Sequence, residues 1–86
     1  MRVVKIDGVC HSLTAHGKER FIERVGEYPE HEMIRMAMEG VPGYQFIWAS
    51  DSSGYHLITV LKVPRGKKLV TIEKNGQVWT LVRRKK

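Results

Sequence analysis

K-L-V-T-I-E-K-N-G-Q-V-W-T-L-V-R-R-K-K, residues 68–86, is the stretch that decides the fold. Asn75-Gly76 separates two runs of alternating apolar residues, which is the strongest short-range signal for a β-hairpin with a two-residue turn. Such a turn fixes the pairing register of the two strands. The predicted cross-strand pairs are Lys74 with Gln77, Ile72 with Trp79, Val70 with Leu81, and Lys68 with Arg83.

The predicted register gathers positive charge at the far end of this hairpin. Lys68 and Arg83 become direct cross-strand neighbours, and like charges placed in this way repel each other. Eight of the 15 basic residues are expected at this end of the sheet: Lys62, Arg65, Lys67, Lys68, Arg83, Arg84, Lys85 and Lys86. A polyanion that neutralises the cluster is therefore the expected partner.

The first half of the chain shows helical periodicity. Thr14 suits the N-cap of a helix over residues 15–25, and Gly26 suits its C-terminal end. Pro29 suits the first position of a second helix, which Gly40 ends. Before these helices, residues 2–6 read as a short strand that stops at Asp7-Gly8.

From Tyr44 onward the apolar period changes from 3.6 to 2. Strands are expected over residues 44–49, 55–63, 68–74 and 77–84, with a turn at residues 51–54. The second of these is apolar on both faces, which favours a central position in the sheet. The sequence thus predicts an α+β domain with a short N-terminal strand and two helices packed on one side of a four-stranded antiparallel meander.

Composition narrows the classes of protein that this chain fits. Its 86 residues predict a single domain, 1–86, and 42% hydrophobic with 28% charged residues is typical of a globular protein. The single cysteine, Cys10, rules out an internal disulfide framework and favours the cytoplasm. No membrane span or signal peptide is expected, because no apolar run is long enough. The net charge of +6 favours nucleic acid as a partner, although charge can also serve solubility alone.

The first predicted helix carries the residues best suited to chemistry. His16, Arg20 and Arg24 are spaced by four and therefore share one stripe of the helix. An imidazole can accept the proton of a ribose 2′-hydroxyl while guanidinium groups stabilise charge on the phosphorane, and this step needs no metal. The alternative is a solvated helix face, in which Glu19 and Glu23 form local salt bridges with these arginines.

Three other groups of residues give weaker indications of function. Cys10 and the four histidines fit no zinc-binding signature, so neither a metal nor another cofactor is expected. Tyr44, Trp48 and Tyr55 are typical of core packing, with stacking on bases as the alternative. Thr80 is expected opposite Thr71, either as a cross-strand hydrogen-bonded pair or as a phosphate donor.

The segment T-A-H-G-K-E-R-F-I-E-R, residues 14–24, followed by a second helix and by strands ending in V-W-T-L-V, resembles a group of small phage and plasmid proteins. These look like relatives of the RelE, barnase and colicin-type ribonuclease fold. The resemblance covers most of the chain between Leu13 and Val82. It implies either metal-independent endoribonuclease activity of the toxin type or a non-catalytic descendant of the fold.

Carried over by position, the resemblance implies roles for four residues. His16 would be the general base or acid, Arg20 and Arg24 would stabilise phosphate, and Thr80 would position the substrate. Gly17 departs from a good helix sequence, and it either weakens the helix or lets a ligand approach the backbone. Toxin-like proteins of this group also imply an acidic antitoxin as a protein partner.

Two other classes of function fit the same residues. The main rival is a non-catalytic binding module, such as a phage protein that engages a host protein or nucleic acid. The third class is a homo-oligomer formed through an edge strand or through the methionine-rich second helix.

Overall fold

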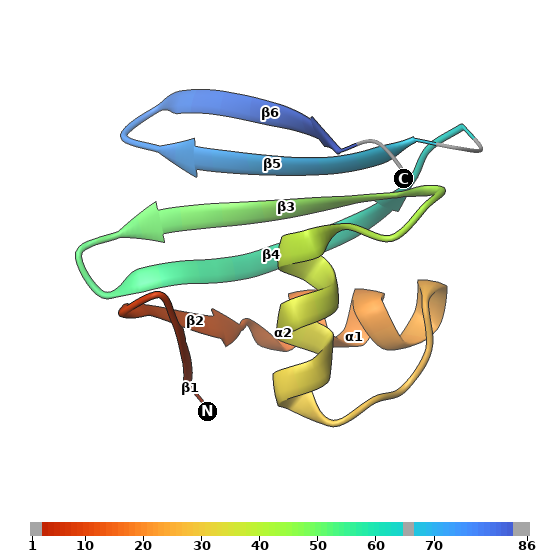
Figure 1. Cartoon of the computed structure of the whole chain (residues 1–86), viewed down its shortest axis with the longest axis horizontal. Helices are drawn as coiled ribbons and strands as arrows, with labels where there is room; N and C mark the ends of the chain where they lie inside the picture. Colours follow the sequence, from red (N-terminus) through yellow and green to blue (C-terminus); the bar gives the residue numbers. More distant parts are fainter. Residues whose placement is uncertain (1–2, 65–66, 84–86) are drawn as a thin grey trace.

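The computed structural model describes residues 3–64 and 67–83, with the backbone alone for residues 81–83. Within these ranges the chain forms two helices and six strands (Figure 1). In chain order the elements are β1 (Val3–Ile6), β2 (Val9–Leu13), α1 (Ala15–Arg24), α2 (Glu30–Glu39), β3 (Tyr44–Asp51), β4 (Gly54–Lys62), β5 (Lys68–Lys74) and β6 (Gln77–Arg83). The α+β class is confirmed.

All six strands belong to one sheet with the order β1-β2-β4-β3-β5-β6. The sheet is mixed: β2 pairs with β4, and β3 with β5, in parallel, whereas the other neighbours are antiparallel. The prediction of a four-stranded antiparallel meander was therefore wrong. It missed β2 and placed β5 beside β4 instead of beside β3.

Both edges of β4 have partners, which explains why β5 does not pair with it. One edge pairs with β3, and the other is covered by β2 and Thr14. β2 pairs with β4 as far as Leu57. The backbone amide and hydroxyl of Thr14 then donate to the Leu57 carbonyl oxygen, at 3.2 and 2.7 Å, and α1 continues along the same edge. A strand that follows β4 can join the sheet only on the other side of β3, where the ladder groups are still unpaired.

Three hairpins close with two-residue turns, and two of these turns share one backbone conformation. The β5–β6 register agrees with the prediction at every pair from Lys68–Arg83 to Lys74–Gln77. Asn75 and Gly76 both have positive φ, 51° and 79°, as a type I′ turn requires. Asp7 and Gly8 have nearly the same values, 52° and 80°, and join β1 to β2. The sequence prediction ended a strand at this second turn and missed the hairpin.

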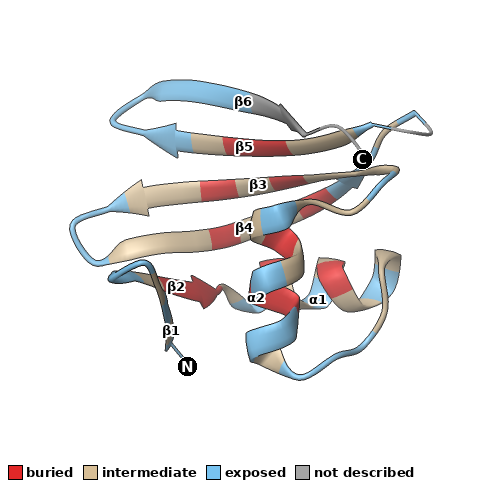
Figure 2. Ribbon diagram, in the orientation of Figure 1, coloured by how far each residue is buried: buried red, intermediate tan, exposed pale blue. Residues whose placement is uncertain are grey.

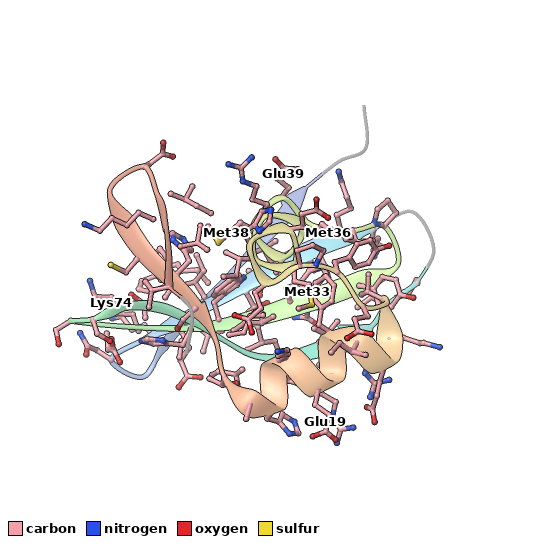
Figure 3. All side chains as sticks on the ribbon, turned by 90° about the horizontal axis from the view of Figure 1, so that it is seen from below. Glu19, Met33, Met36, Met38, Glu39 and Lys74 are labelled. Carbon is pink, nitrogen blue, oxygen red and sulfur yellow. The ribbon has the colours of Figure 1, made fainter. Side chains whose placement is uncertain are left out.

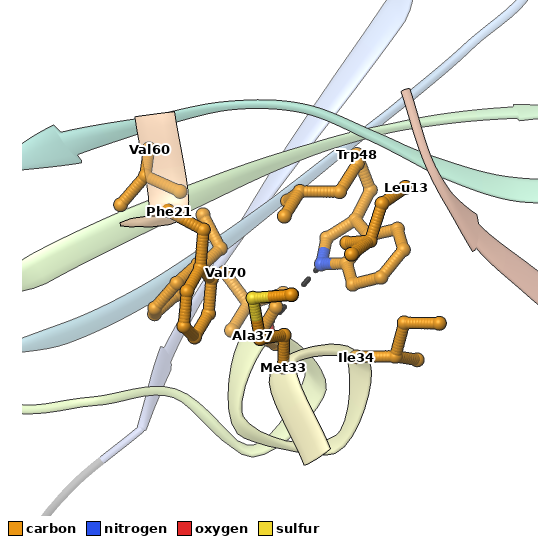
Figure 4. Packing of buried hydrophobic residues seen from close by; sticks show 10 residues of the cluster. Leu13, Phe21, Met33, Ile34, Ala37, Trp48, Val60 and Val70 are labelled. Atoms are coloured by element: carbon orange, nitrogen blue, oxygen red, sulfur yellow. Dashed lines mark hydrogen bonds between the residues drawn. The ribbon is translucent and has the colours of Figure 1, made fainter. Parts of the chain in front are cut away.

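The core lies between the middle of the sheet and the two helices (Figure 4). Trp48 on β3 is fully buried, and its indole Nε1 donates to the Ala37 carbonyl oxygen of α2 at 3.2 Å. Phe21 of α1 packs against Phe46 of β3 with 5.7 Å between ring centroids. The remaining buried apolar members are Leu13, Met33, Ile34, Leu57, Val60 and Val70.

Both helices bury apolar side chains on the same face of the sheet, because Phe46 contacts α1, Trp48 contacts α2, and the two residues share one face of β3. α2 crosses one face of the sheet, while α1 lies beside the edge of β4 (Figures 1 and 3). Beyond α2, the described side chains of β6 are exposed (Figure 2). Trp79, which pairs with Ile72 as predicted, is 47% exposed because none of the described helices covers β6.

Candidate nucleic-acid interface

Basic residues form a row across one end of the sheet. Tyr44 at the start of β3 pairs with Lys62 of β4 on one side and with Lys68 of β5 on the other. Lys68 in turn pairs with Arg83 of β6. Three of the four positions in this row are therefore basic, and the hairpin register predicted one of the pairs, Lys68 with Arg83.

Tyr44 joins this row to the last turn of α1. Its hydroxyl donates to the carbonyl oxygen of Arg24 at 2.7 Å, so the basic residue of that turn is held at the same end of the sheet. The chain after β4 is tied back to this end as well, because the Gly43 amide donates to the Lys67 carbonyl oxygen at 2.8 Å. We call Arg24, Lys62, Lys67 and Lys68 the basic end.

The cations of the basic end are not neutralised within the described part of the chain. Lys62 and Lys67 are exposed, and Lys68 is half-buried with its side chain against Gly40. The ion pairs among described residues lie elsewhere, at Lys18–Glu30, Arg20–Glu23 and His56–Asp51. Arg24 buries its Nε without a hydrogen-bond partner in the described residues. The exposed side chains of Lys62 and Lys67 can therefore contact an anion from solvent.

Several residues of the predicted cluster are described in part or not at all. Arg83 is located through its backbone, which pairs with Lys68. Arg65, Arg84, Lys85 and Lys86 lie outside the described residues.

Of the predicted stripe of His16, Arg20 and Arg24 on α1, Arg20 already forms an ion pair within the helix. His16 is exposed in the first turn, where the Thr14 hydroxyl accepts from the Gly17 amide at 2.9 Å and caps the helix. Arg20 is engaged by Glu23 at 2.6 Å, the local salt bridge that was the alternative interpretation. His16 and Arg24 are eight residues apart on one helix, roughly 12 Å along its axis.

Thr80 is not brought to this helix. β6 forms one edge of the sheet, and β5, β3 and β4 lie between it and α1. The Thr80 hydroxyl is 3.2 Å from that of Thr71, which also accepts from Gln45 Nε2 at 2.8 Å. The cross-strand hydrogen-bonded pair is therefore what the structure contains.

Gly17 is explained by packing. A Cβ at this position would overlap the Leu57 carbonyl oxygen and would lie 2.8 Å from the Leu57 carbonyl carbon. The close approach that this glycine permits is that of β4 to α1, and the sequence alone pointed instead to a weakened helix or to a ligand.

The sequence prediction missed a polar chain at the β3–β4 turn. Ser12 Oγ lies 2.7 Å from His56 Nδ1, and His56 Nε2 lies 2.9 Å from Ser53 Oγ and 3.2 Å from Asp51 Oδ1. The side-chain and backbone hydrogen bonds from Ser53, followed by that from His56, lower the pKa of Asp51 to about 2. Ser12 is buried, so the chain fastens β2 to the turn. The segment D-S-S-G-Y-H, residues 51–56, indicated the turn. The contact with Ser12 could not be predicted, because it depends on the pairing of β2 with β4.

Two further features lie away from the basic end. A cleft of about 390 Å³ between β1 and α2 is lined by Lys5, Ile6, Asp7, Arg35, Met38 and Glu39. His11 is buried between Trp48 and Tyr55, and its Nε2 has no hydrogen-bond partner among the described residues. Neither feature was predicted, because both depend on the β1–β2 hairpin.

Neither a metal cluster nor a membrane-spanning helix is present in the described ranges. Residues 3–64 and 67–83 contain no group of three or more His, Cys, Asp or Glu side chains that could hold a metal ion. None of the helices described is long and apolar enough to cross a membrane. Comparison with protein-family models, with curated proteins and with solved structures gave no match.

Proposed function

We propose that this protein binds RNA through the basic end. The observation that carries the proposal is the cross-strand row in which Lys62 and Lys68 flank Tyr44, with Arg24 held beside it by the Tyr44 hydroxyl. Lys62 and Lys68 lie two strands apart, about 10 Å, so their charges repel each other at low salt, and a phosphate backbone relieves that repulsion. Arginine and lysine at this spacing contact phosphates and carry no base preference of their own.

The test reverses charge where the structure will tolerate it. Lys62 and Lys67 are both exposed, so Lys62→Glu combined with Lys67→Glu leaves the core intact. We expect RNA affinity to fall at least tenfold. With single-stranded RNA, the slope of log affinity against log salt concentration should fall by about 0.7 for each phosphate that the variant no longer neutralises. The measurement is fluorescence anisotropy at several salt concentrations.

The matched control is Lys5→Glu combined with Arg35→Glu. Both residues are exposed cations, and neither belongs to the basic end. This variant has the same net charge as the first. Equal losses of affinity in the two double variants would show that affinity follows net charge, and would contradict a localised interface.

A second candidate function is cleavage of the bound RNA, in keeping with the resemblance to the RelE and barnase-like ribonucleases. The observation that favours it is that His16 is exposed on α1, the same helix that brings Arg24 to the basic end. His16 would take the 2′-hydroxyl proton, Arg20, once released from Glu23, would stabilise the phosphorane, and Arg24 would hold a flanking phosphate. Thr80 takes no part in this step, because it lies at the opposite edge of the sheet.

Cleavage is tested by incubating structured RNA with purified protein in EDTA. We expect fragments with cyclic-phosphate ends, and their loss in His16→Ala, since general base catalysis contributes about 10²–10⁴-fold. His31→Ala is the control, because His31 is likewise exposed in the first turn of a helix. If the wild-type protein leaves the RNA intact, the cleavage proposal is contradicted, and a non-catalytic module that binds RNA or a host protein is the remaining interpretation.

A further inference from the structure

Trp79 is the largest exposed apolar side chain that the fold leaves without a covering element. It is 47% exposed, whereas Trp48, two strands away in the same cross-strand row, is fully buried under α2. The cross-strand neighbour of Trp79 is Ile72, which packs against the core, and side chains paired in this way lie about 5 Å apart. An exposed indole beside an apolar neighbour is a surface on which a planar ring can stack.

The face of β5 that carries Ile72 is basic at both ends. Side chains alternate between faces, so Lys68, Val70, Ile72 and Lys74 share the α2 side of the strand. The contact of Lys68 with Gly40 at the end of α2 agrees with this assignment. Lys74 lies about 7 Å along the strand from Ile72, and Lys68 about 13 Å in the other direction. The strand's acidic residue, Glu73, lies on the opposite face.

We propose that Trp79 stacks on a base of single-stranded RNA whose backbone runs between Lys74 and the basic end. This inference rests on the proposed RNA binding and assigns its substrate class. Duplex RNA hides its base faces within the helical stack, so an aromatic platform selects unpaired nucleotides. The platform tolerates any base, because every base has a π-face, and the flanking lysines supply the contacts to phosphate.

The charge of this face favours RNA over a second copy of the chain. β6 is an edge strand with Val78 and Trp79 exposed, and such an edge can pair with another strand. A copy of the same chain would bring a second set of lysines to a protein whose net charge is already +6. A nucleic-acid backbone brings the opposite charge. Dimerisation through β6 is therefore an outcome that the test must distinguish.

The experiment compares Trp79→Leu with Trp79→Phe. Each is titrated with a single-stranded oligouridylate, with the same oligomer carrying abasic positions, with a duplex, and with inorganic polyphosphate. We expect Trp79→Leu to bind the oligouridylate about tenfold more weakly and Trp79→Phe to recover most of that loss. Polyphosphate affinity should not change, and abasic positions should weaken the wild type but not Trp79→Leu. Circular dichroism confirms that both variants are folded.

The outcomes separate this inference from the proposed function. Unchanged oligouridylate affinity in Trp79→Leu overturns stacking, while weaker binding by Lys62→Glu combined with Lys67→Glu still supports RNA binding. If Trp79→Leu loses affinity for oligouridylate and for polyphosphate equally, this result also overturns stacking. So does a wild-type dimer, measured by sedimentation, that Trp79→Leu converts to monomer. A wild type that binds no RNA overturns both proposals.

Discussion

Gly17 shows how one residue can have a different meaning in the sequence and in the fold. In an exposed helix interior, replacing glycine by alanine stabilises by about 1 kcal/mol. Here α1 lies so close to β4 that an added methyl group would overlap the Leu57 carbonyl oxygen and come within 3.1 Å of Thr14 Oγ1. Both of those groups hold the start of α1 to the sheet.

We therefore expect Gly17→Ala to destabilise the protein by about 1–3 kcal/mol, the usual cost of overpacking a well-packed site. The measurement is urea unfolding followed by circular dichroism. Glu19→Ala is the control, because Glu19 is exposed on the outer side of α1 (Figure 3). A Gly17→Ala variant as stable as Glu19→Ala would mean that α1 moves away from β4 easily. The contact itself cannot be predicted from the sequence, because Gly17 and Leu57 meet only in the fold.

At the scale of the elements, the sequence predicts structure well where the interacting residues are close together in the chain, as in a tight hairpin or a helix cap. Asn75-Gly76 fixed the β5–β6 register in full, and Thr14 capped α1 as predicted. Asp7-Gly8 carries the same turn signal as Asn75-Gly76. The alternation before it covers only four residues, Val3–Ile6, and β2 mixes polar with apolar side chains. A hairpin built from such short strands is weakly specified by pattern alone.

The strand order could not be predicted for a different physical reason. The direction of β5 relative to β4 was right, but its neighbour was wrong. Adjacency of consecutive strands is only a tendency, and it fails when an edge is occupied. β2 and Thr14 occupy the edge of β4 through bonds between residues more than 40 positions apart, as in the 2.7 Å bond from the Thr14 hydroxyl to the Leu57 carbonyl oxygen. Only the tertiary structure reveals such an edge.

The candidate site shows the same difference between contacts that are local in the sequence and contacts that only the fold creates. The Lys68–Arg83 pair was predicted correctly because a tight turn determines it, whereas Lys62 lies at the same end of the sheet with β3 between it and Lys68. Thr80 was grouped with His16 by resemblance, and the wider sheet separates them. The link from Tyr44 to Arg24, which ties the helix to the basic end, needed the relative placement of α1 and β3.

At the scale of the whole molecule, the charge that suits RNA also opposes folding. The net charge is +6, and the basic end concentrates part of it at one end of the sheet. Self-repulsion of this kind destabilises a compact state, and salt screens it. We expect the melting temperature to rise between about 10 mM and about 150 mM NaCl, as the Debye length falls from about 30 to about 8 Å. Each kcal/mol of relieved repulsion should add about 4–8 °C for a domain of this size.

The charge-reversal variant locates the source of that repulsion. Lys62→Glu combined with Lys67→Glu should melt above the wild type at low salt and respond less to added NaCl, because it removes cations where they are densest. Lys5→Glu combined with Arg35→Glu should leave most of the salt response in place. Differential scanning calorimetry of the three proteins makes the comparison. Parallel salt responses in all three would show that the basic end contributes no more repulsion than the rest of the surface, and would weaken the argument that it requires an anionic partner.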